Sequence, residues 1–153
     1  MQSQLDKTAA DRAGLYDEDF FEWTRVNGEL LRAGRFDQAD IEHIAEEIED
    51  MGKRDLKELN SRVRVLLSHL LKWQLQPEKK SRSWERTIAS QRTELGQLLE
   101  DSPSLRVKIQ PNLRHNYQKS VHLAVIETGL PKSHLPAEYP FTVEQILDPE
   151  FLP

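Results

Sequence analysis

The chain has 153 residues, about one domain on the usual length scale, with 37% hydrophobic and 31% charged residues. It contains no cysteine, which excludes disulfides, thiolate nucleophiles and cysteine-liganded metal sites. No stretch approaches the roughly 18 consecutive apolar residues of a membrane span, so we expect a cytoplasmic protein with no membrane partner.

The net charge of −5 is distributed in blocks. Residues 1–50 hold 14 acidic and 5 basic residues, whereas residues 51–119 hold 15 basic and 7 acidic ones. Such blocks indicate either a basic surface for anionic partners or an acidic segment that packs against a basic one within the fold. We favour the second interpretation, because the overall acidity disfavours broad nucleic-acid binding.

A polar, aperiodic stretch begins the chain. We expect residues 1–14 to be a disordered or frayed arm, followed by a single domain over residues 15–153. The first predicted helix runs from a cap at Asp17 to a stop at Gly34. Its apolar residues recur at helical spacing, namely Phe20, Trp23, Leu30 and Leu31.

The strongest periodic signal is an apolar stripe that begins at Ile41 and ends at Trp73. Its members recur close to every 3.6 residues, the repeat of a straight α-helix. They are Ile41, Ile44, Ile48, Met51, Leu56, Leu59, Val63, Leu66, Leu70 and Trp73. The spacing predicts one long helix over about residues 38–75, capped by Asp37, with the whole stripe turned toward other helices.

The length of this helix raises the question of what covers it. A helix over residues 38–75 spans about 57 Å, more than the roughly 40 Å diameter of a compact domain of this size. We therefore expect one of two arrangements. Either its amino-terminal half and the first helix overhang and need a second subunit to cover them, or the chain breaks near Gly52, the one obvious weak point.

The remaining elements follow Pro77, which ends the long helix. Ser83 is predicted to cap a third helix, and Ser102 with Pro103 begins a fourth that ends at Gly129. Residues 130–141 form a proline-rich tail, and a capping box precedes one short final helix. The predicted fold is all-α, an irregular four-helix bundle with one long central helix over about 38–75.

Several segments together resemble a known family. They are Leu15-Tyr16-Asp17, Asp19-Phe20 and Trp23, the stretch 44–52, His69-Leu70-Leu71-Lys72-Trp73-Gln74 with Pro77, Ser83-Trp84 with Thr87-Ile88, Ser102-Pro103-Ser104-Leu105, and Pro140-Phe141-Thr142 to Asp148-Pro149. Over residues 15–153 the chain resembles the bacterial domain of unknown function family 29. The resemblance implies an all-α fold and a bacterial source, and it implies no activity.

A metal site is the first chemistry to consider, because His43 and Glu47 lie one helical turn apart. Imidazole and carboxylate at this spacing can bind zinc or iron. Both residues fall almost opposite the apolar stripe, so we interpret them as a solvated face. We predict no metal and no cofactor, with His43 and Glu47 as the weak candidates.

His69 differs, because it flanks the stripe in the most apolar part of the chain. We predict that it is half buried, finds a hydrogen-bond partner and holds two helices in register rather than acting in catalysis. Lys72, one turn further along, is predicted to face solvent.

An anion site is the second chemistry. Lys79, Lys80, Arg82, Ser83 and Arg86 gather around a predicted helix amino terminus, where free N–H groups favour anions. The alternative, which we prefer, is that this basic loop docks on the acidic first 50 residues or keeps the loop soluble.

No catalytic or cofactor motif stands out, so the sequence does not assign a function. The interpretation it favours is a non-enzymatic interaction or scaffold module that acts as a homodimer, because the overhanging amphipathic helix needs a partner. An unidentified second protein stays open as partner, and a nucleic acid is less favoured. The alternative function is a nucleic-acid-associated or metal-dependent enzyme built around the 79–86 loop or His69.

Overall fold

A computed structural model describes residues 14–153 of the chain, and every regular element in that range is an α-helix or a 3₁₀ helix. The all-α prediction is therefore confirmed. The chain divides into two compact units, Met1–Gly52 and Lys53–Pro153. The predicted arm lies outside the described residues except for its last position, and a single domain over 15–153 stays a prediction. None of the described helices has the length and apolarity needed to cross a lipid bilayer.

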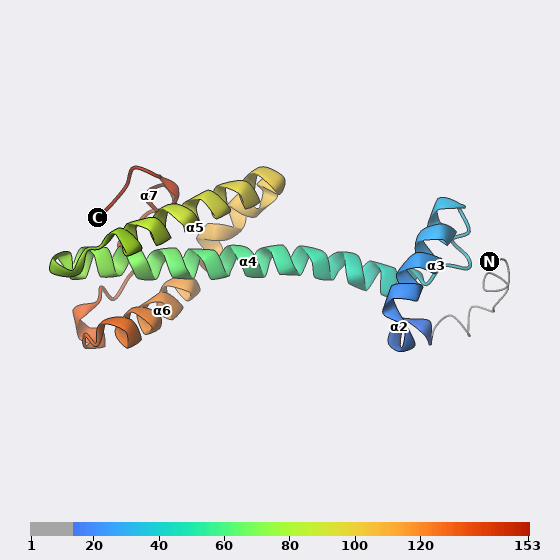
Figure 1. Cartoon of the computed structure of the whole chain (residues 1–153), viewed down its shortest axis with the longest axis horizontal. Coiled ribbons are helices and arrows are strands. Elements are labelled where there is room, and N and C mark those ends of the chain that lie inside the picture. The colour runs from blue at the N-terminus through green and yellow to red at the C-terminus, as the bar shows by residue number, and fades with distance from the viewer. Residues whose placement is uncertain (1–13) are drawn as a thin grey trace. The chain divides into compact units, whose positions relative to one another are not determined.

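The first unit begins with two short helices, α2 (Leu15–Glu18) and α3 (Phe20–Arg32) (Figure 1). Asp19 separates them, and its side chain accepts a hydrogen bond from the backbone N–H of Glu22 at 3.1 Å. The helix cap is thus Asp19 and not Asp17 as predicted. The predicted stop is confirmed, since Gly34 adopts φ 70°, a left-handed conformation that glycine takes without a Cβ clash.

The long predicted helix is present as α4 (Ile41–Leu75). It begins three residues later than predicted, because Asp40 and not Asp37 stands at its start. The backbone carbonyl of Asp40 accepts the N–H of Ile44, and its Oδ1 accepts the N–H of His43 at 3.5 Å. The helix is continuous through Gly52. The predicted alternative, a break at Gly52, is therefore wrong.

The two ends of the α4 stripe differ in burial. Leu59, Val63, Leu66 and Leu70 are at most 1% exposed. By contrast, the three exposed members at the other end are Ile41 at 48%, Ile48 at 62% and Met51 at 55%. The prediction that the whole stripe faces other helices is confirmed from Leu59 onward and is wrong for its first part.

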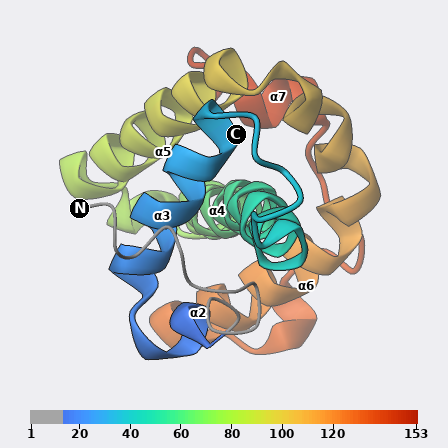
Figure 2. The ribbon, with the colours of Figure 1, turned by 90° about the vertical axis from the view of Figure 1, so that its right-hand side faces the viewer.

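The second unit surrounds the buried part of α4 with two long helices, α5 (Arg82–Asp101) and α6 (Ile109–Thr128). Viewed along α4, Figure 2 shows α5, α6 and α7 (Val143–Leu147) placed around it. The connections contain 3₁₀ turns at Pro77–Lys79, Pro103–Lys108 and Lys132–His134. Helix α5 is capped by Ser81, whose hydroxyl accepts the backbone N–H of Trp84, and not by Ser83 as predicted.

Helix α7 and the proline-rich tail close the second core. The capping box at α7 is confirmed, with reciprocal bonds between Thr142 and Gln145. Arg92 on α5 is buried and donates to the backbone carbonyls of Ile146, Phe151 and Gln145 at 2.9, 2.8 and 3.1 Å. Because three carbonyls accept from one guanidinium, a single side chain fixes the end of the chain.

The buried core of this unit contains residues of α4, α5, α6, α7 and the tail. The buried side chains of α3 belong to the first unit instead. The predicted four-helix bundle is thus a core of three long helices, α4, α5 and α6, closed by α7, and the first predicted helix lies in the other unit.

Candidate functional site

The first unit is organised around the carboxylate of Asp40. Its Oδ2 accepts the indole N–H of Trp23 at 2.9 Å and the Nδ1–H of His43 at 2.6 Å. The backbone N–H of Asp40 donates to Asn27 Oδ1 at 2.8 Å, while Asn27 Nδ2 donates to the carbonyl of Trp23. Asn27, a weak helix former in the middle of α3, thus joins α3 to the start of α4.

Tyr16 contacts both weak metal candidates, His43 and Glu47. Its ring stacks on His43 at a centroid distance of 4.0 Å, and its hydroxyl donates to Glu47 at 2.7 Å. His43 and Glu47 are both partly buried, so their interpretation as a solvated face is wrong. Within residues 14–153, no group of three or more histidine or acidic side chains is placed to hold a metal ion.

These contacts shift the ionisation of the cluster. Partial burial raises the pKa of Asp40, but hydrogen bonds from Trp23 and His43 outweigh it and leave the pKa below its usual value. The hydrogen bond to Asp40 raises the pKa of His43 despite some desolvation. The hydrogen bond to Glu47 raises the pKa of Tyr16 to about 12. At neutral pH the cluster therefore favours a carboxylate at Asp40 and a neutral phenol at Tyr16.

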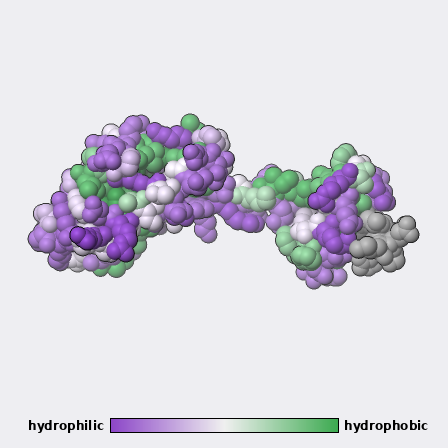
Figure 3. Space-filling model, turned by 45° about the horizontal axis from the view of Figure 1, so that its top comes forward, coloured by the Kyte–Doolittle hydropathy of each residue, from purple (hydrophilic) through white to green (hydrophobic). Residues whose placement is uncertain are grey.

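The first unit also carries an unusual apolar surface. The described chain has ten exposed large hydrophobic side chains, and seven of them belong to residues 14–52. We call these seven the first-unit apolar surface: Phe20, Phe21, Leu31, Phe36, Ile41, Ile48 and Met51. Figure 3 shows hydrophobic surface gathered over the first part of α4. Scattered single apolar residues are normal on a protein surface, whereas contiguous apolar patches are typical of interaction sites.

In the second unit, Lys72 is buried and not solvent-facing as predicted. Its ammonium donates to Glu127 of α6 at 2.5 Å and lies 5.0 Å from the ring centroid of Trp84 on α5. An ammonium buried away from water requires such partners. Lys72 therefore links α4 to both neighbouring helices, which is the role predicted for His69.

His69 is half buried, as predicted. Its Nδ1–H donates to the carbonyl of Val65 at 2.9 Å, which leaves Nε2 unprotonated and 3.4 Å from the ammonium of Lys72. Desolvation, together with the nearby charge of Lys72, lowers the pKa of His69. Its partners lie on its own helix, so the predicted role between two helices belongs to Lys72.

The predicted anion site lies in the loop before α5. Lys79, Lys80, Arg82, Ser83 and Arg86 are all exposed. The ammonium of Lys80 lies over the Trp73 ring at 4.9 Å from its centroid. The Ser81 hydroxyl already accepts a hydrogen bond from the backbone N–H of Trp84. The five residues are thus near one another along the chain, and no buried polar side chain among them defines a ligand position.

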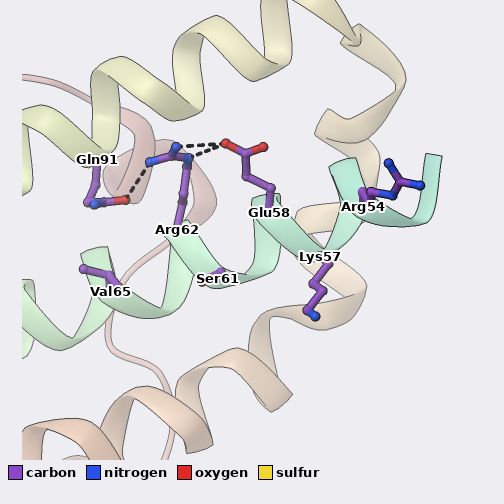
Figure 4. A pocket seen from close by; sticks show the side chains of 7 residues that line it. All are labelled: Arg54, Lys57, Glu58, Ser61, Arg62, Val65 and Gln91. Atoms are coloured by element: carbon purple, nitrogen blue, oxygen red, sulfur yellow. Dashed lines mark hydrogen bonds and ion pairs between the residues drawn. The ribbon is translucent and has the colours of Figure 1, made fainter. Parts of the chain in front are cut away.

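An open groove of about 490 Å³ lies between α4 and α5. Figure 4 shows its lining, in which Arg62 pairs with Glu58 and donates to Gln91. Arg54 and Lys57 add two further cations, and Val65 is the one apolar lining residue.

The structure as a whole defines an all-helical protein whose most distinctive surface is apolar and sits beside an acidic stretch. The chain belongs to the family described as Domain of unknown function DUF29, whose model matches residues 15–152. No curated protein and no solved structure matches it.

Proposed function

We propose that this protein is a non-enzymatic helical interaction module that acts as a homodimer through its first-unit apolar surface. The observation that carries the proposal is the concentration of seven exposed large hydrophobic side chains within residues 14–52. A bacterial, cytoplasmic setting, expected from the sequence, belongs to the same proposal.

The energetics favour a surface that is covered as a whole. Fully burying one Ile, Met or Phe side chain contributes about 1.5–3 kcal/mol. Association costs an estimated 4–15 kcal/mol in lost freedom of motion, so one or two such contacts do not suffice. Seven residues, each partly exposed, supply enough apolar area for a stable contact if most of them are buried together.

Sedimentation equilibrium of the purified protein tests the proposal. We expect a mass of twice the 17.8 kDa of one chain. A variant with Ile48→Ser and Met51→Ser should shift to a single-chain mass. The matched control is Ile126→Ser, since Ile126 is also a helical isoleucine and is 66% exposed, but belongs to the second unit. A measured mass of one chain for the wild-type protein at micromolar concentration would contradict the proposal.

A further inference from the structure

A second pocket lies in the second unit, between α6 and the tail that follows it. Its volume is about 470 Å³. Pockets that hold small molecules measure roughly 300–1,000 Å³. Its eight lining residues all fall between positions 117 and 137, so a single unit forms the whole pocket.

The inner surface of this pocket is apolar. Val121 and Leu135 line it and are each 6% exposed, and the lining residue Tyr117 is 3% exposed. Pro136 and Ala137 add two further apolar side chains. The groove between α4 and α5, by contrast, has one apolar lining residue. A mostly apolar lining with a few polar groups is the usual composition of a small-molecule site.

A hydrogen bond between its two walls holds the pocket in shape. The Tyr117 hydroxyl on α6 donates to the backbone carbonyl of Pro136 in the tail at 2.6 Å. Burial raises the pKa of Tyr117 to about 12, so the hydroxyl stays protonated at neutral pH and keeps this bond. The Tyr117 ring also packs edge-on against Tyr139, with the ring centroids 6.3 Å apart. The pocket is therefore formed before a ligand arrives, which lowers the cost of binding.

The polar lining residues indicate the charge of the ligand. Lys132 is the one charged side chain in the lining, and among the described residues its ammonium has no ion pair or hydrogen bond. The side chains of Gln118 and Ser133 likewise have no hydrogen-bond partner in the part of the chain that the structure describes. Glu138, which follows the lining residues, pairs with Arg114 at 3.5 Å. A carboxylate in the pocket would gain an ion pair from the ammonium and hydrogen bonds from the two neutral donors.

We infer that this pocket binds a small monocarboxylic acid with an apolar body, whose carboxylate pairs with Lys132 and whose body lies against Val121 and Leu135. Inorganic phosphate matches the pocket less well, because the lining offers one cation and its buried part is apolar. A neutral apolar molecule fits the same lining but gains no ion pair. The inference goes beyond the proposed homodimer and does not depend on it, since the first-unit apolar surface belongs to the other unit.

Nuclear magnetic resonance titration of the ¹⁵N-labelled full chain with phenylacetate tests the inference. We expect a dissociation constant of about 1 mM or less, with the amide shift changes centred on residues 117–121 and 132–137. Phenylacetamide has the same shape without the charge, and acetate has the charge without the ring. Each should bind at least about tenfold more weakly. No shift change at these residues with phenylacetate at up to about 10 mM would overturn the inference.

A pair of lysine variants tests the ion pair. Lys132→Met removes the ammonium and keeps an apolar stem, so it should weaken phenylacetate binding roughly tenfold and leave phenylacetamide binding unchanged. Lys119→Met is the matched control, because Lys119 is exposed on α6 and does not line the pocket. Equal effects of the two substitutions on phenylacetate binding would overturn the role of Lys132.

A third variant tests the position of the site. Ala137→Trp places a large ring at the pocket, and because Ala137 is exposed the fold has room for it. We expect this variant to lose binding of both phenylacetate and phenylacetamide, while its amide spectrum away from the pocket stays that of the wild type. Unchanged binding in this variant would place the ligand elsewhere and overturn the inference. Equal affinities of the wild type for phenylacetate and phenylacetamide, or for phenylacetate and phosphate, would overturn the assignment to an apolar carboxylate.

Discussion

The two parts of α4 have the same apolar periodicity and different surroundings. From Leu59 onward the stripe is buried among α5, α6 and α7, whereas Ile41, Ile48 and Met51 are about half exposed or more. Helical periodicity therefore indicates an amphipathic helix and does not indicate what covers its apolar face. In the second unit the cover belongs to the same chain. In the first unit we propose that it belongs to a second copy.

The largest expected effect separates the two parts of the helix directly. Leu66→Ala should lower the free energy of unfolding by about 2–5 kcal/mol, because Leu66 is fully buried. Ile48→Ala, at a protein concentration low enough for single chains, should change it by less than about 0.5 kcal/mol. Urea denaturation measures both values, and similar losses for the two variants would remove the distinction between the halves.

The next effect concerns how the second unit closes its own core. Arg92→Met keeps most of the side-chain volume and removes the donors to three backbone carbonyls. We expect a loss of about 2–4 kcal/mol, since buried carbonyls are left without partners. Arg86→Met on the same helix is the control, because Arg86 is exposed. A loss for Arg92→Met no larger than that for Arg86→Met would show that the chain end is held in another way.

The two units should also respond to pH in opposite directions. The pKa of His43 is raised above its ordinary value of 6.5 by Asp40, so its contribution to stability is present below about pH 6.5 and is lost as pH rises through the folded-state pKa. The pKa of His69 is lowered by desolvation, so its contribution is present above about pH 6.5 and is lost as pH falls through the folded-state pKa.

Nuclear magnetic resonance of the imidazole protons measures both titrations in one sample. We expect the midpoint of His43 above 6.5 and the midpoint of His69 below it. His43→Gln and His69→Gln assign the two signals. Midpoints on the same side of 6.5, or in reversed order, would contradict the hydrogen bonds described for the two residues.

The smallest expected effect concerns the basic loop. Replacing Lys79, Lys80 and Arg82 together by glutamate should change the free energy of unfolding by less than about 1 kcal/mol, because all three are exposed. The same variant decides whether the loop binds anions. A salt-dependent affinity of the wild type for DNA or RNA that disappears in this variant would support the alternative nucleic-acid function.

Local signals in the sequence predicted local structure well. The stops at Gly34 and Gly129 and the capping box at α7 were predicted from residues that lie next to one another in the chain. The helix starts were less well predicted, since Asp37 and Asp40 have equal capping chemistry. The contact between Asn27 and Asp40 that distinguishes them joins residues 13 positions apart.

Contacts between distant residues explain the remaining differences. Lysine is usually a surface residue. Lys72 is buried because its ammonium donates a hydrogen bond to Glu127, 55 positions away. His43 and Glu47 look like a solvated face until Tyr16 is placed against them. In each case the partner that offsets the cost of burial lies on another helix, and helical periodicity carries no information about it.

Hydrogen–deuterium exchange at two protein concentrations tests whether a second copy covers the first part of α4, because it observes both parts of the helix in one experiment. If a second copy covers the first-unit apolar surface, amides of residues 41–51 should exchange more slowly at high concentration than at low concentration, while amides of residues 59–75 exchange at the same rate in both. Exchange of residues 41–51 that is independent of concentration across the micromolar range would contradict the proposed dimer.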